Sequence, residues 1–270
     1  MEYAETIMNK RGLFDRLVRG RTGGPGVIAA NQTIAVYGTQ GGVGTSCLTA
    51  VLSKTLHRWG FTVLVVEAAA SGGSFLRLMG KRPANNGLDT ISKNREKMNS
   101  ELEDIKVNII KGLSTLPRSG APYNTQWAWK EEEALELLRL ARKMAGTGFM
   151  VVDAGNLLSD ALSRAALIDA DHIVSLFRPT DMGIDAAIRF YEQTRYANLS
   201  DKLIWIANQA YSSKDSAQLA GIIEQKINYC IPWENSMKSM EQGDKVPQNV
   251  QSIAEELLHN LISAPSARVF

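Results

Sequence analysis

Several residue types that often carry chemistry are scarce in this chain of 270 residues. The two cysteines, Cys47 and Cys230, lie far apart without metal-ligand spacing, which excludes a disulfide scaffold and fits a reducing compartment. The three histidines are scattered, so we expect no metal site of the protein's own. No apolar run approaches the ~20 residues that cross a bilayer, and no apolar signal core precedes the first charges.

A large excess of charge of either sign is also absent. The 30 basic and 28 acidic residues nearly cancel, for a formal net charge of +2. This balance gives no general attraction to nucleic acid or to an anionic membrane, so DNA is an unlikely partner. By contrast, 44% of the residues are hydrophobic, enough for one large α/β domain with a substantial core.

Buried strand patterns alternate with helical patterns along most of the chain. The strands are expected at 33–39, 62–68, 107–113, 148–154, 172–178 and 202–208, and the helices at 130–145, 159–168, 182–196, 215–226 and 248–262. Continuous apolar strands joined by helices indicate right-handed βαβ units. We therefore predict one α/β domain over 33–270, a doubly wound and mostly parallel sheet with helices on both faces.

Residues 1–32 differ from this pattern. They combine a basic amphipathic stretch with the Gly-rich linker "RGRTGGPG" at 19–26. Such a segment can dock on a membrane or on a partner, or it can pack on its own domain. Both interpretations stay open.

The first strand leads into "GTQGGVGTSC" (38–47), a phosphate-binding loop without a lysine. In such loops, glycines free successive backbone N–H groups to converge on phosphate oxygens, and a hydroxyl reaches Mg²⁺. Ser46 supplies that hydroxyl, whereas Thr45 stands where the lysine would reach the β- and γ-phosphates. The candidate nucleotide-binding residues are Gly41, Gly42, Val43, Gly44, Thr45, Ser46 and Cys47. Cys47 could carry an activated thiol at the helix start, or be a small buried residue.

The loop and the segments after it resemble the MinD/ParA family of deviant Walker A ATPases, over residues 33–262. Its loop pattern K-G-G-x-G-K-[ST] becomes "QGGVGTS" here, and its acidic-x-acidic signature becomes "EAA" in "TVLVVEAAASGG". The resemblance implies that Asp153 in "GFMVVDAGN" is linked to Mg²⁺ together with Ser46. It also implies that Asn208 in "LIWIANQA" and Pro232 in "CIPWENS" lie at the adenine, although Asp153 could equally cap a segment and Asn208 could merely end its strand.

Three charged groups of that family are replaced. In the family, one lysine crosses a dimer interface, the other holds phosphates, and the second acid positions the attacking water; here Gln40, Thr45 and Ala69 stand in their places. Removing one such group costs about 10²- to 10³-fold in rate. The resemblance thus implies ATP or ADP with Mg²⁺ bound weakly or not at all, and hydrolysis near background. Lys54, Arg77, Lys81 and Arg178 could replace the lost charge, with Arg178 the best placed.

The family's members organise positions inside the cytoplasm, including division sites, partitioned DNA, pili and secretion machines. The lost lysines resemble the TadZ/CpaE-like pilus-assembly branch most closely. We therefore expect a homodimeric pseudo-ATPase scaffold that positions a membrane-associated machine, at the membrane or the cell pole. The alternatives are an active ATPase switch with an unorthodox cation and, more weakly, a partition ATPase that binds DNA.

Overall fold

The computed structural model describes residues 31–70, 72, 74–119, 129–210, 220–223, 225–233 and 246–263. The predicted segment 1–32 therefore lies outside the described residues except for 31 and 32. The predicted helix 215–226 is described only at 220–223, 225 and 226. Within these ranges, no helix combines the length and apolar character that a membrane crossing requires.

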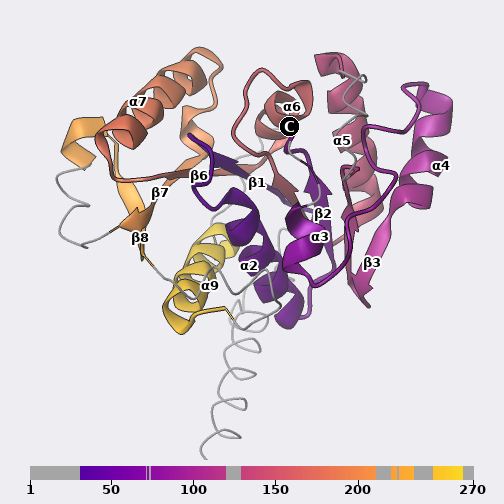
Figure 1. Cartoon of the computed structure of the whole chain (residues 1–270), viewed down its shortest axis with the longest axis horizontal. Helices are drawn as coiled ribbons and strands as arrows, with labels where there is room; N and C mark the ends of the chain where they lie inside the picture. The colour runs from indigo at the N-terminus through magenta and orange to yellow at the C-terminus, as the bar shows by residue number, and fades with distance from the viewer. Residues whose placement is uncertain are drawn as a thin grey trace, which may run out of the picture.

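Eight strands form one sheet (Figure 1) in the order β3-β4-β2-β5-β1-β6-β7-β8. They are β1 (Thr33–Gly38), β2 (Val63–Glu67), β3 (Val107–Ile110), β4 (Leu113–Leu116), β5 (Phe149–Asp153), β6 (His172–Phe177), β7 (Leu203–Ala210) and β8 (Ile227–Pro232). All neighbouring strands are parallel except β3 and β4. The predicted doubly wound, mostly parallel sheet is confirmed.

Helices cover both faces of the sheet. They are α2 (Thr45–Arg58), α3 (Ser74–Leu78), α4 (Arg95–Ile105), α5 (Glu131–Ala145), α6 (Ala161–Asp169), α7 (Asp181–Tyr196), the 3-10 turn η1 (Ser200–Lys202) and α9 (Gln248–Ser263). In Figure 1, α2, α3 and α9 lie on one side, and α4 to α7 on the other. The start of α5 carries three glutamates, as expected for a helix N-terminus.

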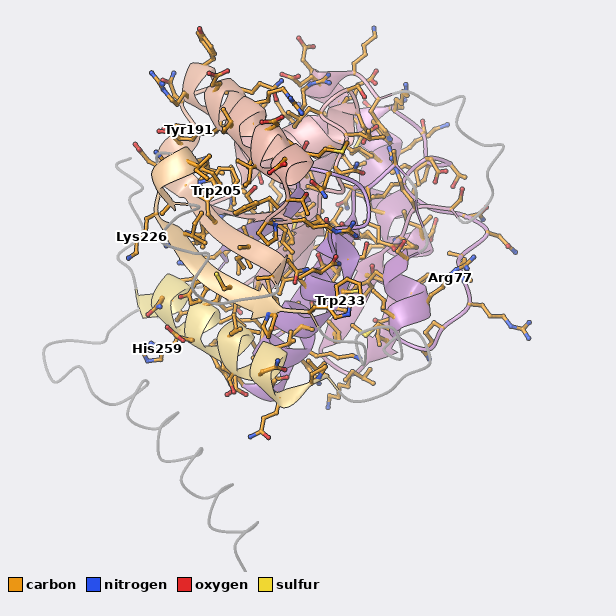
Figure 2. The ribbon with its side chains drawn as sticks, turned by 60° about the vertical axis from the view of Figure 1, so that its left-hand side comes forward. Arg77, Tyr191, Trp205, Lys226, Trp233 and His259 are labelled. Carbon is orange, nitrogen blue, oxygen red and sulfur yellow. The ribbon has the colours of Figure 1, made fainter. Side chains whose placement is uncertain are left out.

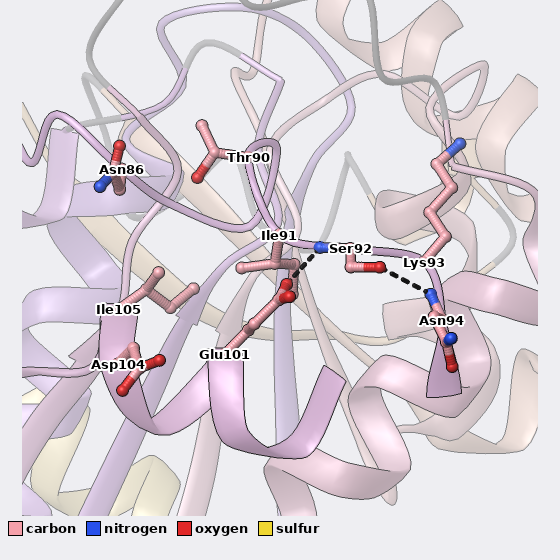
Figure 3. A pocket seen from close by; sticks show the side chains of 9 residues that line it. All are labelled: Asn86, Thr90, Ile91, Ser92, Lys93, Asn94, Glu101, Asp104 and Ile105. Carbon is pink, nitrogen blue, oxygen red and sulfur yellow. Dashed lines mark hydrogen bonds between the residues drawn. The ribbon is translucent and has the colours of Figure 1, made fainter. Parts of the chain in front are cut away.

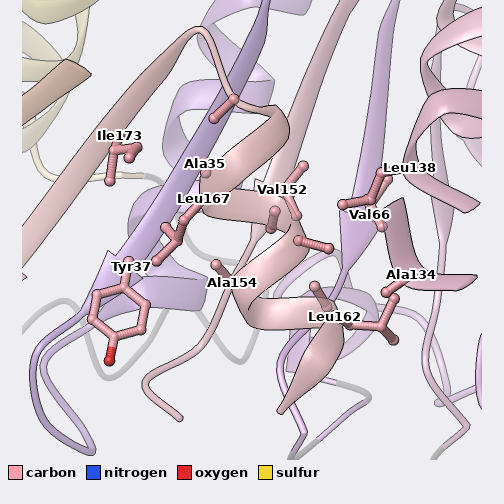
Figure 4. Packing of buried hydrophobic residues seen from close by; sticks show 14 of the residues in the cluster. Ala35, Tyr37, Val66, Ala134, Leu138, Val152, Ala154, Leu162, Leu167 and Ile173 are labelled. Carbon is pink, nitrogen blue, oxygen red and sulfur yellow. The ribbon is translucent and has the colours of Figure 1, made fainter. Parts of the chain in front are cut away.

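The two faces of the strands fill two separate cores, because alternate residues point to opposite sides. Ile34 and Val36 of β1 pack with α2 and α9, whereas Ala35 and Tyr37 pack with α5, α6 and α7. Figure 4 shows Ala35 of the sheet close to Leu167 of α6 in the second core. With central strands buried on both faces, the continuous apolar runs of the sequence follow directly.

One strand prediction was wrong, and one strand was missed. The single strand expected at 107–113 is a pair, since β3 and β4 run antiparallel on either side of Lys111 and Gly112. Gly112 has φ +89, a value that an L residue adopts only with strain, so the chain reverses there. β8 was not predicted as a strand at all. Both misses concern the outer strands, where β3 and β8 each have one neighbour and partly exposed residues.

Candidate functional site

The glycine loop lies at the carboxyl edge of the sheet, between the end of β1 and the start of α2. Its neighbours follow from the strand order, because β5 and β6 flank β1 and β7 lies beside β6. The segments after these three strands therefore meet around the loop. This edge is where open α/β sheets bind their ligands.

The loop leads directly into the N-terminus of α2. The N-cap residue Gly44 has φ +97 and makes no side-chain capping bond, and the first turn contains no acid. The first N–H groups of a helix have no intrahelical partner and carry partial positive charge. This end of α2 can accept an anion.

Ser46 and Asp153 are brought together beneath the loop. The Ser46 hydroxyl donates to Asp153 Oδ2 at 2.5 Å, and the Gly155 amide donates to Asp153 Oδ1 at 3.2 Å. Burial raises the pKa of Asp153, and the bonds from Ser46 and Gly155 lower it in part. A hydroxyl beside a carboxylate is a set of hard oxygen ligands that fits Mg²⁺. These residues would hold a magnesium ion that accompanies a phosphate chain.

The replaced positions pack against neighbouring parts of the protein. Thr45 is 9% exposed, and its Oγ1 lies 2.5 Å from where a Cβ on Gly38 would stand. Ala69 is also buried, and a Cβ on Gly155 would lie 2.9 Å from the Ala69 Cβ. Gln40 Oε1 would be 2.8 Å from a Cβ on Gly183, at the start of α7. None of these three uncharged side chains can offer a positive charge or a carboxylate.

Glu67, the acid that the resemblance retains, ends β2 beside Asp153. The two residues are register partners across β2 and β5, and Glu67 is 1% exposed. Its Oε1 accepts a 2.6 Å bond from the Phe75 amide in α3. Glu67 therefore joins the end of β2 to the helix that follows.

Side chains from β7 bind the loop from its carbonyl side. Asn208 Nδ2 donates to Val43 O at 2.6 Å, and Gln209 Nε2 donates to Gly42 O at 3.3 Å. Consecutive strand residues normally point to opposite faces. Here the β7–β8 register shifts between Asn208 and Ala210, and Gln209 has φ +61, which lets both amides reach the loop.

Both ends of the Asn208 side-chain amide thus make hydrogen bonds to backbone groups of the protein itself. Its Oδ1 accepts from the Gln209 amide at 2.9 Å, while its Nδ2 lies only 2.7 Å from where a Cβ on Gly44 would stand. Pro232, the other residue expected at the adenine, is exposed at the end of β8. The following Trp233 is 42% exposed and donates its amide to Ala210 O at 3.1 Å.

Arg178, the residue after β6, contacts the loop. Its Nη2 donates to Gly42 O at 2.7 Å. Lys54, by contrast, follows Thr45 by nine residues on α2, about 13 Å along the helix axis. Burial lowers the pKa of Lys54, whose side chain is half-buried. Of these two candidate cations, only Arg178 is brought to the loop.

Sequence reasoning missed Tyr37 and Asn156, which tie the loop to the segment after β5. The Tyr37 hydroxyl donates to Asn156 O at 3.1 Å, and Asn156 Nδ2 is 3.7 Å from where a Cβ on Gly41 would stand. Tyr37 stacks on Phe190 of α7, with ring centroids 4.4 Å apart. Phe190 in turn meets Trp205 of β7 edge-on, and Figure 2 shows Trp205 under α7. An aromatic residue before a glycine loop was the only available signal.

A separate pocket of about 600 Å³ lies beside α4, lined by residues of the 86–94 segment and of the helix (Figure 3). Its wall carries Glu101, which accepts a hydrogen bond from the Ser92 amide, together with Lys93 and Asp104. Two carboxylates and one amine give this pocket no preference for a phosphate chain. It also lies on the β3–β4 side of the sheet, away from the glycine loop.

Solved structures with this fold include a ParA family ATPase and MinD proteins. A ParA family ATPase from Chlorobium tepidum is 19% identical, with a TM-score of 0.70 over 86% of this chain and 97% of that one. The MinD cell division protein of Aquifex aeolicus is 18% identical, with a TM-score of 0.66 over 87% and 99%. The MinD protein of Pyrococcus horikoshii, in complex with Mg-ADP, is 17% identical, with a TM-score of 0.67 over 87% and 99%.

No curated protein is similar enough in sequence to count as a relative. The family assignment comes instead from a family model that matches residues 31–187, more than half of the chain. This range contains β1, the glycine loop, Asp153 and Arg178. The chain therefore belongs to the family described as cellulose biosynthesis protein BcsQ, and it has the fold of solved ParA and MinD proteins.

Proposed function

We propose that this protein is a dimerising scaffold with a degenerate nucleotide site, which hydrolyses ATP at a rate near background. The observation that carries the proposal is the contrast within one site. Ser46 donates a hydrogen bond to Asp153, which supports a shared magnesium site, whereas Thr45 and Ala69 are buried and uncharged. Phosphoryl transfer needs positive charge positioned on the transferring group, and these positions supply none.

The process that we propose for the scaffold follows the family description. The sequence alone suggested pilus assembly, secretion or division. In this proposal, the protein instead positions the machinery of cellulose biosynthesis. One of the solved structures, from Aquifex aeolicus, is a MinC:MinD complex. By analogy, we propose a protein partner at the membrane-associated cellulose machinery.

The dimer surface in this proposal is the carboxyl edge of the sheet around the loop. Leu157, after β5, and Met182, in the first turn of α7, are 48% and 81% exposed at this edge. Trp233, after β8, is also exposed there. Large apolar side chains exposed around one site are typical of a protein interface.

Sedimentation velocity at tens of micromolar, with and without ATP and Mg²⁺, tests the scaffold. We expect a dimer in both conditions, which Met182→Glu converts to a monomer. Tyr196→Glu is the matched control, because Tyr196 is 91% exposed at the other end of the same 16-residue helix. A wild-type protein that remains monomeric at this concentration contradicts the proposal.

A phosphate-release assay on the same sample tests the loss of hydrolysis. An observation that favours the second candidate, an active ATPase switch, is the contact of Arg178 with the loop at 2.7 Å. Turnover well above background that Arg178→Ala abolishes would support the switch. In cells, a variant that cannot dimerise should fail to restore cellulose production to a deletion strain.

A further inference from the structure

The glycine loop combines anion-binding geometry with an unfavourable charge balance. Its backbone N–H groups and the start of α2 attract phosphate, but the loop segment 38–47 contains no lysine or arginine. Two carboxylates, Glu67 and Asp153, lie buried beneath it. A polyphosphate that carries several negative charges needs a cation in this place.

Arg178 lies at the rim of the loop because of the strand order. Leu176 of β6 is the register partner of Gly38, where the loop begins, and Arg178 follows two residues later. Its Nη2 lies 2.7 Å from Gly42 O and would be 3.4 Å from a Cβ on Gly42. The guanidinium therefore touches the middle of the loop, and a side chain at Gly42 would crowd it.

Within the described residues, the Arg178 guanidinium uses only part of its hydrogen-bonding capacity. An arginine has five N–H donors, and within the described residues the bond to Gly42 O is the hydrogen bond that Arg178 donates. Its Nε is shielded from solvent and makes no hydrogen bond to the described part of the chain. Arg178 can thus keep its contact with Gly42 while another of its nitrogens binds a phosphate oxygen.

Holding the loop does not require a charged residue at this position. Gly42 O also accepts a hydrogen bond from Gln209 Nε2 at 3.3 Å, and Val43 O accepts one from Asn208 Nδ2 at 2.6 Å. Neutral amides from β7 already bind both carbonyls. The distinct property that arginine adds is a permanent positive charge with planar donor geometry, which suits phosphate.

We propose that Arg178 is the phosphate-binding cation of this loop and takes over, from the adjacent strand, the charge that Gln40 and Thr45 lack. The ligand class is a nucleoside di- or triphosphate, bound through its phosphate chain. This inference rests on the nucleotide site of the proposed function, not on dimer formation. It concerns binding alone and includes no group-transfer step.

Calorimetric titration of the full chain with ATP, ADP and inorganic tripolyphosphate, each with Mg²⁺, tests the assignment. Arg178→Gln is the central variant, because a glutamine keeps a neutral N–H donor but carries no charge. A charge-assisted hydrogen bond contributes about 10- to 100-fold in affinity. We expect Arg178→Gln to weaken all three ligands by that factor, and their residual binding to depend less on salt.

Two further variants separate charge from structure. Arg178→Lys keeps the charge and should lose less affinity than Arg178→Gln, whereas Arg189→Ala removes a charge from the exposed face of α7 and should stay within about twofold of wild type. A role limited to holding the loop would remove this difference, with glutamine tolerated as well as lysine. Thermal melts of each variant confirm that the fold is retained.

Two outcomes would overturn the proposal. One is binding of ATP and tripolyphosphate by Arg178→Gln with affinities within about threefold of wild type. The other is a wild-type protein that binds neither ligand at millimolar concentration. Sedimentation remains an independent test, since a dimer that binds no phosphate would remove the role of Arg178 and leave the scaffold standing.

Discussion

Replacing Gly44 by alanine should destabilise the protein more than alanine at other glycines, because two penalties coincide there. Gly44 has φ +97, where an L residue is strained by about 1–2 kcal/mol. In addition, the new Cβ would lie 2.7 Å from Asn208 Nδ2, so the amide must move and lose its bond to the buried Val43 carbonyl. Losing that bond costs about 1–3 kcal/mol. We expect a total of about 2–5 kcal/mol in the free energy of unfolding.

Alanine substitutions at two other glycines measure the backbone strain separately from the side-chain contact. Gly60 has φ +89 with nothing within 4 Å of a Cβ, so Gly60→Ala should show the backbone strain alone, about 1–2 kcal/mol. Gly41 has neither feature, since its nearest neighbour is Asn156 Nδ2 at 3.7 Å, and Gly41→Ala should be nearly neutral. Urea unfolding followed by tryptophan fluorescence gives all three values, because Trp205 and Trp129 are buried.

A double-mutant cycle tests the cause. Asn208→Ala removes the amide that the alanine at position 44 would meet, so the two substitutions together should cost about 1 kcal/mol less than their sum. Equal destabilisation by Gly44→Ala and Gly60→Ala, or strict additivity in the cycle, would refute the assigned contact.

Three shorter predictions concern the surroundings of the loop. Burial raises the pKa of Asp153 above its ordinary 3.8, so its folded form favours the proton, and the penalty for its charge grows as pH rises through the folded pKa. Asp153→Asn should therefore unfold at higher urea than wild type at pH 7, with the advantage fading near pH 4; a constant difference would contradict the burial. Tyr37→Phe removes the 3.1 Å bond to Asn156 O but keeps the stacking on Phe190, and should cost about 0.5–1.5 kcal/mol in urea unfolding; a cost above 3 kcal/mol would mean that the ring has shifted. Thr45→Lys should strengthen calorimetric ATP binding about 10-fold or more by restoring a phosphate-directed cation, and unchanged affinity in a folded variant would show that the loop admits no phosphate.

The central part of the fold could be predicted because its signals are local. β1, β2, β5 and β6 are continuous apolar runs, and such runs mark strands that are covered on both faces. The loop was equally visible, since glycine spacing after a strand and before a helix is a short-range pattern. The antiparallel pair at 107–116 was missed because Gly112 lies inside an apolar run, where a turn and a continuing strand look alike.

The contacts around the loop could not be predicted residue by residue. Asn208 and Gln209 reach the loop only because a register shift at Gln209 turns two consecutive side chains toward it. That shift depends on the pairing of β7 with β8, a strand that the sequence pattern did not reveal. The position of Arg178 was anticipated from its place at the end of a strand, but its bond to Gly42 depends on β6 lying next to β1.

The strand order also explains how such a loop can persist without lysines. Its carbonyls are bound by Asn208 and Gln209 from β7 and by Arg178 from β6, and its hydroxyl is bound by Asp153 from β5. The shape of the loop is therefore determined by neighbouring strands, and the missing lysines would have contributed charge rather than shape. In the function that we propose, their absence removes charge that phosphoryl transfer requires while the cradle of N–H groups stays in place. Whether such a loop still binds phosphate must then depend on the charges that adjacent strands bring to its rim.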